Sequence, residues 1–289
     1  MRIRCGLSAA GQLTRASITS KSALNTPGQT LLPSILSQLD PRRRAAPATV
    51  TSARIRPEEA FFAIGDIHGC TAHLNKLFGL LDEVANGSET CVFLGDYIDR
   101  GPHSREVLLQ LYELSQLRPD RVICLMGNHE RMLLNFIDDP AGTGLAWLRN
   151  GGVATLTSFG VEVPEDAIHS GATVDLARQL EDALPKGLQE WLRVLPKHWS
   201  TGNMHCVHAA MSPNRPPEDQ RGAILLWGHP DFLSKPRTDG NIVVHGHTVV
   251  KRANLSGGRI ALDTGAYLTG RLTAAHITPG ECRFIEARS

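Results

Sequence analysis

The 289-residue sequence predicts an α/β protein, because short apolar segments alternate with segments of helical periodicity along its first half. Two further observations refine this class. Each early apolar segment ends in a block rich in Gly, Asp, His and Asn, and later strand-like segments follow one another without long helices between them. We therefore expect two packed sheets with helices outside them, a four-layer α/β/β/α sandwich with a helical cap insertion.

Three early apolar segments have the length and composition of buried parallel strands, and a segment with apolar residues at helical spacing follows each one. The expected strands are residues 60–64, 91–94 and 122–126, and the expected helices are residues 72–84, 104–117 and 131–137. This order predicts right-handed crossovers and a mostly parallel sheet.

Residues 138–200 interrupt the alternation. Pro140 and several Gly residues open the segment, and residues 173–195 have helical periodicity with a break at Pro185. We interpret the segment as a helical cap insertion, with a plain helical layer as the alternative. Strand-like segments then return at residues 203–207, 241–244, 259–262 and 271–277, and these predict a second sheet.

The N-terminal segment, residues 1–56, differs in composition. It is rich in Arg, Ser and Thr and has Asp40 as its single acidic residue. This composition fits an organellar transit peptide, a disordered basic tail or an incorrectly assigned start codon. We assign residues 57–289 to the folded domain.

Composition limits the partners that we expect. The net charge of +1 gives no general attraction to nucleic acid or membranes, and no apolar segment approaches the ~18 residues of a membrane span. The six cysteines show no CxxC pair, and we expect reduced thiols in a cytoplasmic protein.

The polar blocks predict a metal centre. Strand ends meet at one edge of an open sheet, and carboxylate, imidazole and amide oxygen are ligands of divalent metals. Two such ions need about six ligands with one shared between them, and Asp96 is the expected bridge because it lies between the others in chain order. The six candidates are Asp66, His68, Asp96, Asn128, His208 and His247.

These motifs resemble the calcineurin-like metallophosphoesterases, and more narrowly the bacterial branch of the phosphoprotein phosphatase family of serine/threonine phosphatases. The resemblance runs from about residue 61 to the C-terminus. It rests on GDIHG, GDYIDRG and GNHE, followed by VHA, HGHT and DTGA.

The resemblance implies how the ligands divide. Asp66, His68 and Asp96 would hold one metal, and Asp96 would share the second metal with a further set. That further set is Asn128, His208 and His247. Members of the family commonly use manganese or iron, sometimes with zinc, and we expect two Mn²⁺ ions here.

A hydroxide between two cations would attack phosphorus in line, because the cations lower the pKa of bound water. His129 is the expected proton donor for the leaving oxygen, and Asp99 would orient it and keep it protonated. Arg100 would clamp the phosphoryl oxygens. The alternatives are that His129 is a metal ligand and that Arg100 forms an ion pair with Asp99.

Two further positions are open. Bacterial relatives usually carry a phosphate-binding arginine where this sequence has His229. Either His229 binds phosphate more weakly or another arginine replaces the missing one, and a turn residue is the alternative. Asp263 either orients a metal-bound histidine or forms a turn. The candidate replacements are Arg131, Arg252 and Arg271.

The expected function is hydrolysis of phosphoserine and phosphothreonine in proteins, with phosphotyrosine open. The first alternative is a symmetrical diadenosine polyphosphate hydrolase of the same superfamily. Those relatives tend to have Ala-Arg at Asp99-Arg100 and GNHD where Glu130 stands here. The second alternative is a non-catalytic scaffold that binds phosphoproteins, which a degenerate ligand set would indicate.

Overall fold

The computed structural model describes residues 48–165 and 172–289. The predicted N-terminal extension therefore lies outside the described residues as far as residue 47. Strand β1 (Thr49–Thr51) pairs antiparallel with β11 (Glu281–Arg288), and Ile55 is buried in the core. The folded unit thus begins before the boundary at residue 57 that composition suggested.

The first sheet contains the three predicted early strands. Its order is β1-β11-β10-β2-β3-β4, and β2, β3 and β4 are parallel. These are β2 (Phe61–Ile64), β3 (Thr90–Phe93) and β4 (Val122–Cys124), with helices α1 (Thr71–Asp82), α2 (Ser104–Leu117) and α3 (Asn128–Asp138). The alternation of strand and helix predicted this half of the sheet.

Strand β10 (Arg271–Thr278) corrects one prediction. We expected residues 271–277 in the second sheet, but β10 lies in the first sheet, antiparallel to both β2 and β11. Ala274 and Ala275 pair with Ile64 and Ala63 of β2. Position late in the chain does not determine which sheet a strand joins, and antiparallel pairing with β2 makes the first sheet mixed.

The second sheet has the order β5-β6-β7-β9-β8. Three of its strands match predicted segments: β6 (Met204–Val207), β7 (Ile242–His245) and β9 (Arg259–Ala261). The short strands β5 (His198–Thr201) and β8 (Asn254–Ser256) pair antiparallel at its two edges. Since β6, β7 and β9 are parallel, their C-terminal ends lie at one edge of this sheet.

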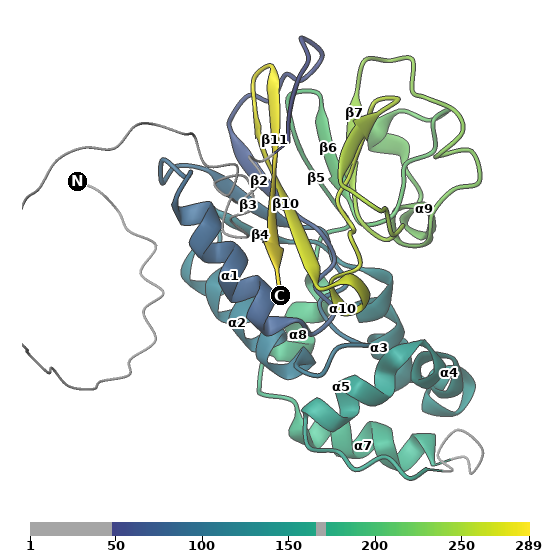
Figure 1. Cartoon of the computed structure of the whole chain (residues 1–289). Helices are drawn as coiled ribbons and strands as arrows, with labels where there is room; N and C mark the ends of the chain where they lie inside the picture. The colour runs from purple at the N-terminus through teal and green to yellow at the C-terminus, as the bar shows by residue number, and fades with distance from the viewer. Residues whose placement is uncertain (1–47, 166–171) are drawn as a thin grey trace, which may run out of the picture. The chain divides into compact units, whose positions relative to one another are not determined.

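Alternating side chains divide the core into layers. Phe61 and Ala63 of β2 pack with the second sheet, whereas Phe62 and Ile64 pack with the helices. Helices α1 and α2 cover the first sheet in Figure 1, and Leu225 of α9 (Gly222–Trp227) packs on the outer face of the second sheet. The predicted four-layer α/β/β/α sandwich is confirmed.

The described part of residues 138–200 is mainly helical, and β5 begins at its C-terminal end. Helices α4 and α5 and the π-helical turn between them pack near α2 and α3, and α7 and α8 flank Pro185. Their bounds are α4 (Pro140–Trp147), the π-helical turn (Leu148–Gly152), α5 (Val153–Ser158), α7 (Thr173–Ala183) and α8 (Leu188–Val194). A short 3₁₀ turn (Pro217–Asp219) and α10 (Ala266–Thr269) complete the helices in the described ranges.

Within residues 48–165 and 172–289, no helix is long and apolar enough to cross a membrane.

The buried hydroxyl of Tyr97 connects the ends of β3 and β4 beneath the polar blocks. It donates to the carbonyl oxygen of Leu125 at 2.6 Å and lies 3.2 Å from that of Phe93.

Candidate metal centre

The predicted ligands lie at the C-terminal ends of strands from both sheets. Asp66 and His68 follow β2, and Asp96 follows β3. Asn128 is the first residue of α3, after β4. His208 follows β6, and His247 comes two residues after β7, so two stacked sheets present their strand ends to a common site.

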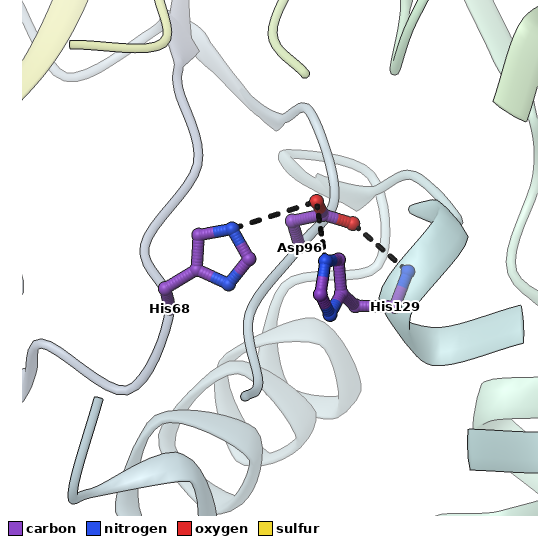
Figure 2. Close-up of side chains that lie close together, drawn as sticks. All are labelled: His68, Asp96 and His129. Carbon is purple, nitrogen blue, oxygen red and sulfur yellow. Dashed lines mark hydrogen bonds and ion pairs between the residues drawn. The ribbon is translucent and has the colours of Figure 1, made fainter. Parts of the chain in front are cut away.

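Two groups of side chains are close enough to hold metal ions. The ligand atoms of His68, Asp96 and His129 lie within 4.8 Å of one another, as do those of Asp96, His208 and His247. Figure 2 shows the rings of His68 and His129 beside the Asp96 carboxylate, with His68 Nε2 3.6 Å and His129 Nε2 3.8 Å from Oδ2. Asp96 belongs to both groups, as a bridging ligand must.

The other two predicted ligands join the second group. Asn128 Oδ1 lies 2.7 Å from His208 Nε2 and 2.9 Å from His247 Nδ1. The backbone N–H of His247 donates to the Asp66 carboxylate at 3.0 Å. Gly246 permits this approach, because a Cβ atom there would lie 1.9 Å from Asp66 Oδ1. All six predicted ligands therefore lie in one cluster.

Backbone carbonyls orient two of the histidines. His68 Nδ1 lies 2.7 Å from the oxygen of Ile98, and His208 Nδ1 lies 3.0 Å from the oxygen of Leu94. A carbonyl oxygen only accepts, so Nδ1 carries the proton in each ring and Nε2 presents its lone pair toward Asp96. This arrangement is typical of metal-binding histidines.

The buried charges also fit divalent cations. Burial, together with Asp263 and Asp96, raises the pKa of Asp66 well above its ordinary value, and burial and Asp96 raise the pKa of Glu130 to about 8. Burial lowers the pKa of His68 to about 3, so this imidazole is neutral. Crowded carboxylates beside neutral imidazoles match the donor set of manganese, iron or zinc, which the sequence alone could not distinguish.

Backbone strain is concentrated at the same place. In the described ranges, every non-glycine residue with positive φ is a predicted site residue. A left-handed conformation is unfavourable for residues with a Cβ atom, and such residues cluster at functional sites. The five residues are His68, Asp96, Asp99, Arg100 and His247.

His129 and Asp99 form a buried pair beside the first group. Nδ1 of His129 lies 2.6 Å from Asp99 Oδ2, and both side chains are buried. Burial lowers the pKa of His129, but Asp96 and the hydrogen bond and charge of Asp99 outweigh it, so the net pKa is raised. A protonated Nε2 can act as an acid, although the same atom also belongs to the first metal-binding group, which was the alternative.

Arg100 lies against the first group and not against Asp99. Its Nη1 is 3.1 Å from His68 Nε2 and 3.3 Å from the hydroxyl oxygen of Tyr267, and its guanidinium stacks 4.9 Å from the Tyr267 ring centroid. Among the ion pairs of the described ranges, none joins Arg100 to Asp99. This position favours the phosphate clamp over the ion pair.

Comparison with protein families supports this geometry. The family model of the calcineurin-like phosphoesterases matches residues 60–251, which is more than half of the chain and includes all six predicted metal ligands. The chain belongs to the calcineurin-like phosphoesterase family.

The curated relatives of this phosphoesterase include two kinds of enzyme. It is 46% identical over 74 residues, 26% of this chain and 20% of the relative, to the "Putative serine/threonine-protein phosphatase C06A1.3" of Caenorhabditis elegans. It is 31% identical over 152 residues, 53% of this chain and 44% of the relative, to a symmetrical bis(5'-nucleosyl)-tetraphosphatase of Janthinobacterium sp. (strain Marseille). The chain thus spans less than half the length of these curated relatives.

Among solved structures, the fold of the chain is similar to that in the crystal structure of a "putative diadenosine tetraphosphatase". The TM-score is 0.56 at 23% identity, covering 81% of this chain and 96% of the other. At this level of identity the likeness supports the fold alone.

Both open positions of the phosphoesterase make turn contacts, which was one of the alternatives for each. His229 Nδ1 accepts the backbone N–H of Asp231 at 3.1 Å, which is a turn contact, and His229 also lines a cavity of about 330 Å³ together with His247. Asp263 Oδ1 accepts the backbone N–H of Gly265 at 2.8 Å. Among the described hydrogen bonds none joins Asp263 to a histidine, so its observed contact is that of the turn.

Sequence reasoning did not assign a role to Glu130. Its carboxylate accepts the backbone N–H groups of Asp96, Tyr97 and Gly127 at 2.9, 2.8 and 3.0 Å. It thereby joins the loop after β3 to the start of α3. The position of Glu130 in the GNHE motif was the one sign in the sequence that it has a role. The motif does not specify its hydrogen-bond partners, because these are backbone N–H groups.

Three side-chain contacts, two from the insertion and one from α10, were also not predicted from the sequence. Trp147 Nε1 and Thr155 Oγ1 donate to Asp99, and Tyr267 contacts Arg100. The ring of Trp147 is buried in the core, whereas its N–H group meets the carboxylate of Asp99.

Proposed function

We propose that this protein is a metal-dependent phosphomonoesterase whose substrates have an alkoxide leaving group, such as phosphoserine and phosphothreonine in proteins. The Asp99–His129 pair carries the proposal, with its 2.6 Å contact between Nδ1 and Oδ2. An alkoxide is a poor leaving group, and a positioned acid accelerates its departure. The proposal also adopts the bacterial phosphoprotein phosphatase branch that the motifs resemble.

The ligand cluster supports a binuclear centre with Asp96 as the shared residue, and Mn²⁺ is the proposed ion. When bound, two divalent cations supply charge neutralisation at the phosphoryl group and a nucleophile at neutral pH. His129 Nε2–H then donates its proton to the leaving oxygen as the bond to phosphorus breaks. Arg100 donates two parallel N–H bonds to phosphoryl oxygens, which fixes their orientation.

Symmetrical hydrolysis of dinucleoside tetraphosphates is the second candidate, and the relatives support it more than they support protein dephosphorylation. The match to a symmetrical tetraphosphatase covers 53% of this chain, against 26% for the protein phosphatase. Trp227 lines the cavity beside His247 and is 47% exposed, so it offers a surface on which a base can stack. The leaving group would be a nucleoside diphosphate, which departs without a protonated histidine.

A non-catalytic scaffold is disfavoured by the complete cluster of ligands and the intact Asp99–His129 pair. Such a protein would have no need of a buried acid beside two metal-binding groups.

The test compares substrates on protein reconstituted with Mn²⁺, and the measurement is repeated with iron and zinc. We expect hydrolysis of p-nitrophenyl phosphate and of a phosphothreonine peptide, and loss of both activities in Asp96→Asn. Asp182→Asn makes the same chemical change at an exposed position and should retain wild-type rates. A strong preference for diadenosine tetraphosphate over the peptide would establish the second candidate, and no hydrolysis of any substrate would favour the scaffold.

A further inference from the structure

The inserted helices contact the Asp99–His129 pair directly. Trp147 Nε1 donates to Asp99 Oδ2 at 2.9 Å, and Thr155 Oγ1 donates to Asp99 Oδ1 at 2.6 Å. Trp147 ends α4 and Thr155 lies in α5, on either side of the π-helical turn. All four side chains are buried, so water does not replace these hydrogen bonds.

The backbone of the insertion contacts the next residue of the same loop. The N–H of Arg100 donates to the carbonyl oxygen of Gly151 at 3.2 Å. Gly151 has a φ of 108°, and a Cβ atom there would lie 2.8 Å from Arg100 N and Cγ. Asp99 and Arg100 themselves have φ values of 69° and 70°. The insertion therefore packs on the loop at Asp99 and Arg100, the residues at which the backbone of the loop is strained.

Trp147 also connects the loop to the helix that carries His129. Its ring packs on Phe136 of α3 with centroids 4.6 Å apart, and a Cβ atom on Gly152 would lie 2.5 Å from the ring. Rotation of the indole is thus restricted from two sides, which fixes the direction of its N–H group toward Asp99.

The donors around Asp99 leave His129 a defined position. Oδ1 is bound by Thr155, and Oδ2 is shared by Trp147 and His129. The backbone N–H of Asp99 also donates to Thr155 Oγ1 at 2.9 Å and to Ser104 Oγ at 3.0 Å, so both the backbone and the side chain of Asp99 are held. A carboxylate fixed in this way can direct Nδ1 of one imidazole and hence the opposite Nε2–H.

We propose that Trp147 and Thr155 are positioning residues for protonation of the leaving group, acting through Asp99 on His129. This inference rests on the proposed phosphomonoesterase function and assigns the insertion a role in it. In the reaction, a P–O bond to the incoming hydroxide oxygen forms and the P–O bond to the leaving oxygen breaks. The leaving oxygen takes the proton of His129 Nε2, and water restores that proton after product release.

The variants separate the hydrogen bonds from packing. Thr155→Val keeps the shape and removes the hydroxyl, whereas Thr155→Ser keeps the hydroxyl. Trp147→Phe removes the N–H donor and keeps an aromatic ring. Trp191→Phe is the matched control, since Trp191 is buried in the same insertion and contacts Tyr112 instead of Asp99.

Rates are measured on a series of phosphomonoesters with leaving groups from p-nitrophenol to threonine. We expect Thr155→Val and Trp147→Phe to lose about tenfold in kcat on the phosphothreonine peptide, the value of one charge-assisted hydrogen bond, and little on p-nitrophenyl phosphate. Thr155→Ser and Trp191→Phe should behave as the wild type. Equal losses on both esters, or no loss on either, would overturn the inference.

A spectroscopic measurement distinguishes failure of the inference from failure of the proposed function. The short Nδ1–H···Oδ2 hydrogen bond of His129 should give a strongly downfield proton NMR signal in wild type and in Thr155→Ser. In Thr155→Val and Trp147→Phe this signal should shift upfield or broaden. An unchanged signal would contradict the positioning role even if the enzyme proved to cleave only dinucleotides, whereas wild-type inactivity on monoesters alone would count against the proposed function.

Discussion

Replacing Asp99 with Asn tests the proposed acid most directly, because it removes charge and conserves shape. Asn Oδ1 can take the place of Asp Oδ2 and accept from His129 and Trp147. The new NH₂ group would then face Thr155 Oγ1, whose own proton can turn to Ser104 Oγ at 3.1 Å. The hydrogen-bond network therefore survives, and the loss is that of the negative charge beside the imidazolium.

The size of the effect follows from the kind of hydrogen bond. Bonds to charged groups contribute about 1.5–3 kcal/mol and neutral ones about 0.5–1.5 kcal/mol, so the charge of Asp99 favours the protonated imidazole by about 1–1.5 kcal/mol. Since 1.4 kcal/mol is a factor of ten, protonation of His129 should become about tenfold less favourable. Asp99 raises the pKa of His129, so its replacement lowers that pKa and the loss grows as pH rises.

The assay compares kcat for a phosphothreonine peptide and p-nitrophenyl phosphate across pH, with Asp182→Asn as the exposed control. We expect Asp99→Asn to lose about tenfold on the peptide near neutral pH, with the alkaline limb of its pH–rate profile moved to lower pH. The p-nitrophenyl ester should be hydrolysed within a few-fold of the wild-type rate. A uniform loss on both substrates at all pH values would refute the reasoning, because it would place Asp99 in metal binding or folding.

Three further predictions concern stability and metal affinity. Tyr97→Phe should lower the free energy of unfolding by about 1–2 kcal/mol in denaturant titrations, because its buried hydroxyl is hydrogen-bonded, whereas Tyr112→Phe should have little effect. Gly246→Ala should weaken Mn²⁺ binding at least tenfold by calorimetry, because the added Cβ would displace the Asp66 carboxylate; unchanged affinity would exclude Asp66 as a ligand. Burial and a neighbouring histidine lower the pKa of His198 from 6.5 to about 4. The unfolded chain therefore binds a proton at His198 more readily than the folded chain does. The free energy of unfolding should decrease as pH falls from about 6.5 toward 4. His198→Phe should flatten the fall in Tm of chelator-treated protein over this range, and an unaltered slope would show that other groups are responsible.

The sequence predicted that the candidate metal ligands lie together, because each one comes at or soon after the end of a strand. A buried strand followed by Gly and a polar residue places that residue at the sheet edge, whatever the rest of the fold does. Asp66, Asp96 and His247 are cases of this kind, and they lie together as expected. The partner sheet of β10 was not predictable in the same way, because its apolar pattern fits burial in either sheet.

The contacts around Asp99 were beyond sequence reasoning for a different reason. Trp147 and Thr155 are 48 and 56 residues away from Asp99 along the chain, and a helical pattern does not say where a buried donor group points. A tryptophan at an apolar position satisfies the same periodicity whether its N–H group meets a carboxylate or a backbone carbonyl. Only the packing of α4 and α5 on the loop settles the partner.

The strain at the site explains why such distant contacts are needed. Five non-glycine residues with positive φ cost about 1–3 kcal/mol each, which a surface loop would relax by changing its conformation. Here the loops are held from several sides: Glu130 accepts three backbone N–H groups behind Asp96, and Gly151 accepts that of Arg100. The insertion thus stabilises a loop conformation that the loop's own sequence disfavours, and its loss should affect the direction of the Asp99 carboxylate before it affects the ligands on the second sheet.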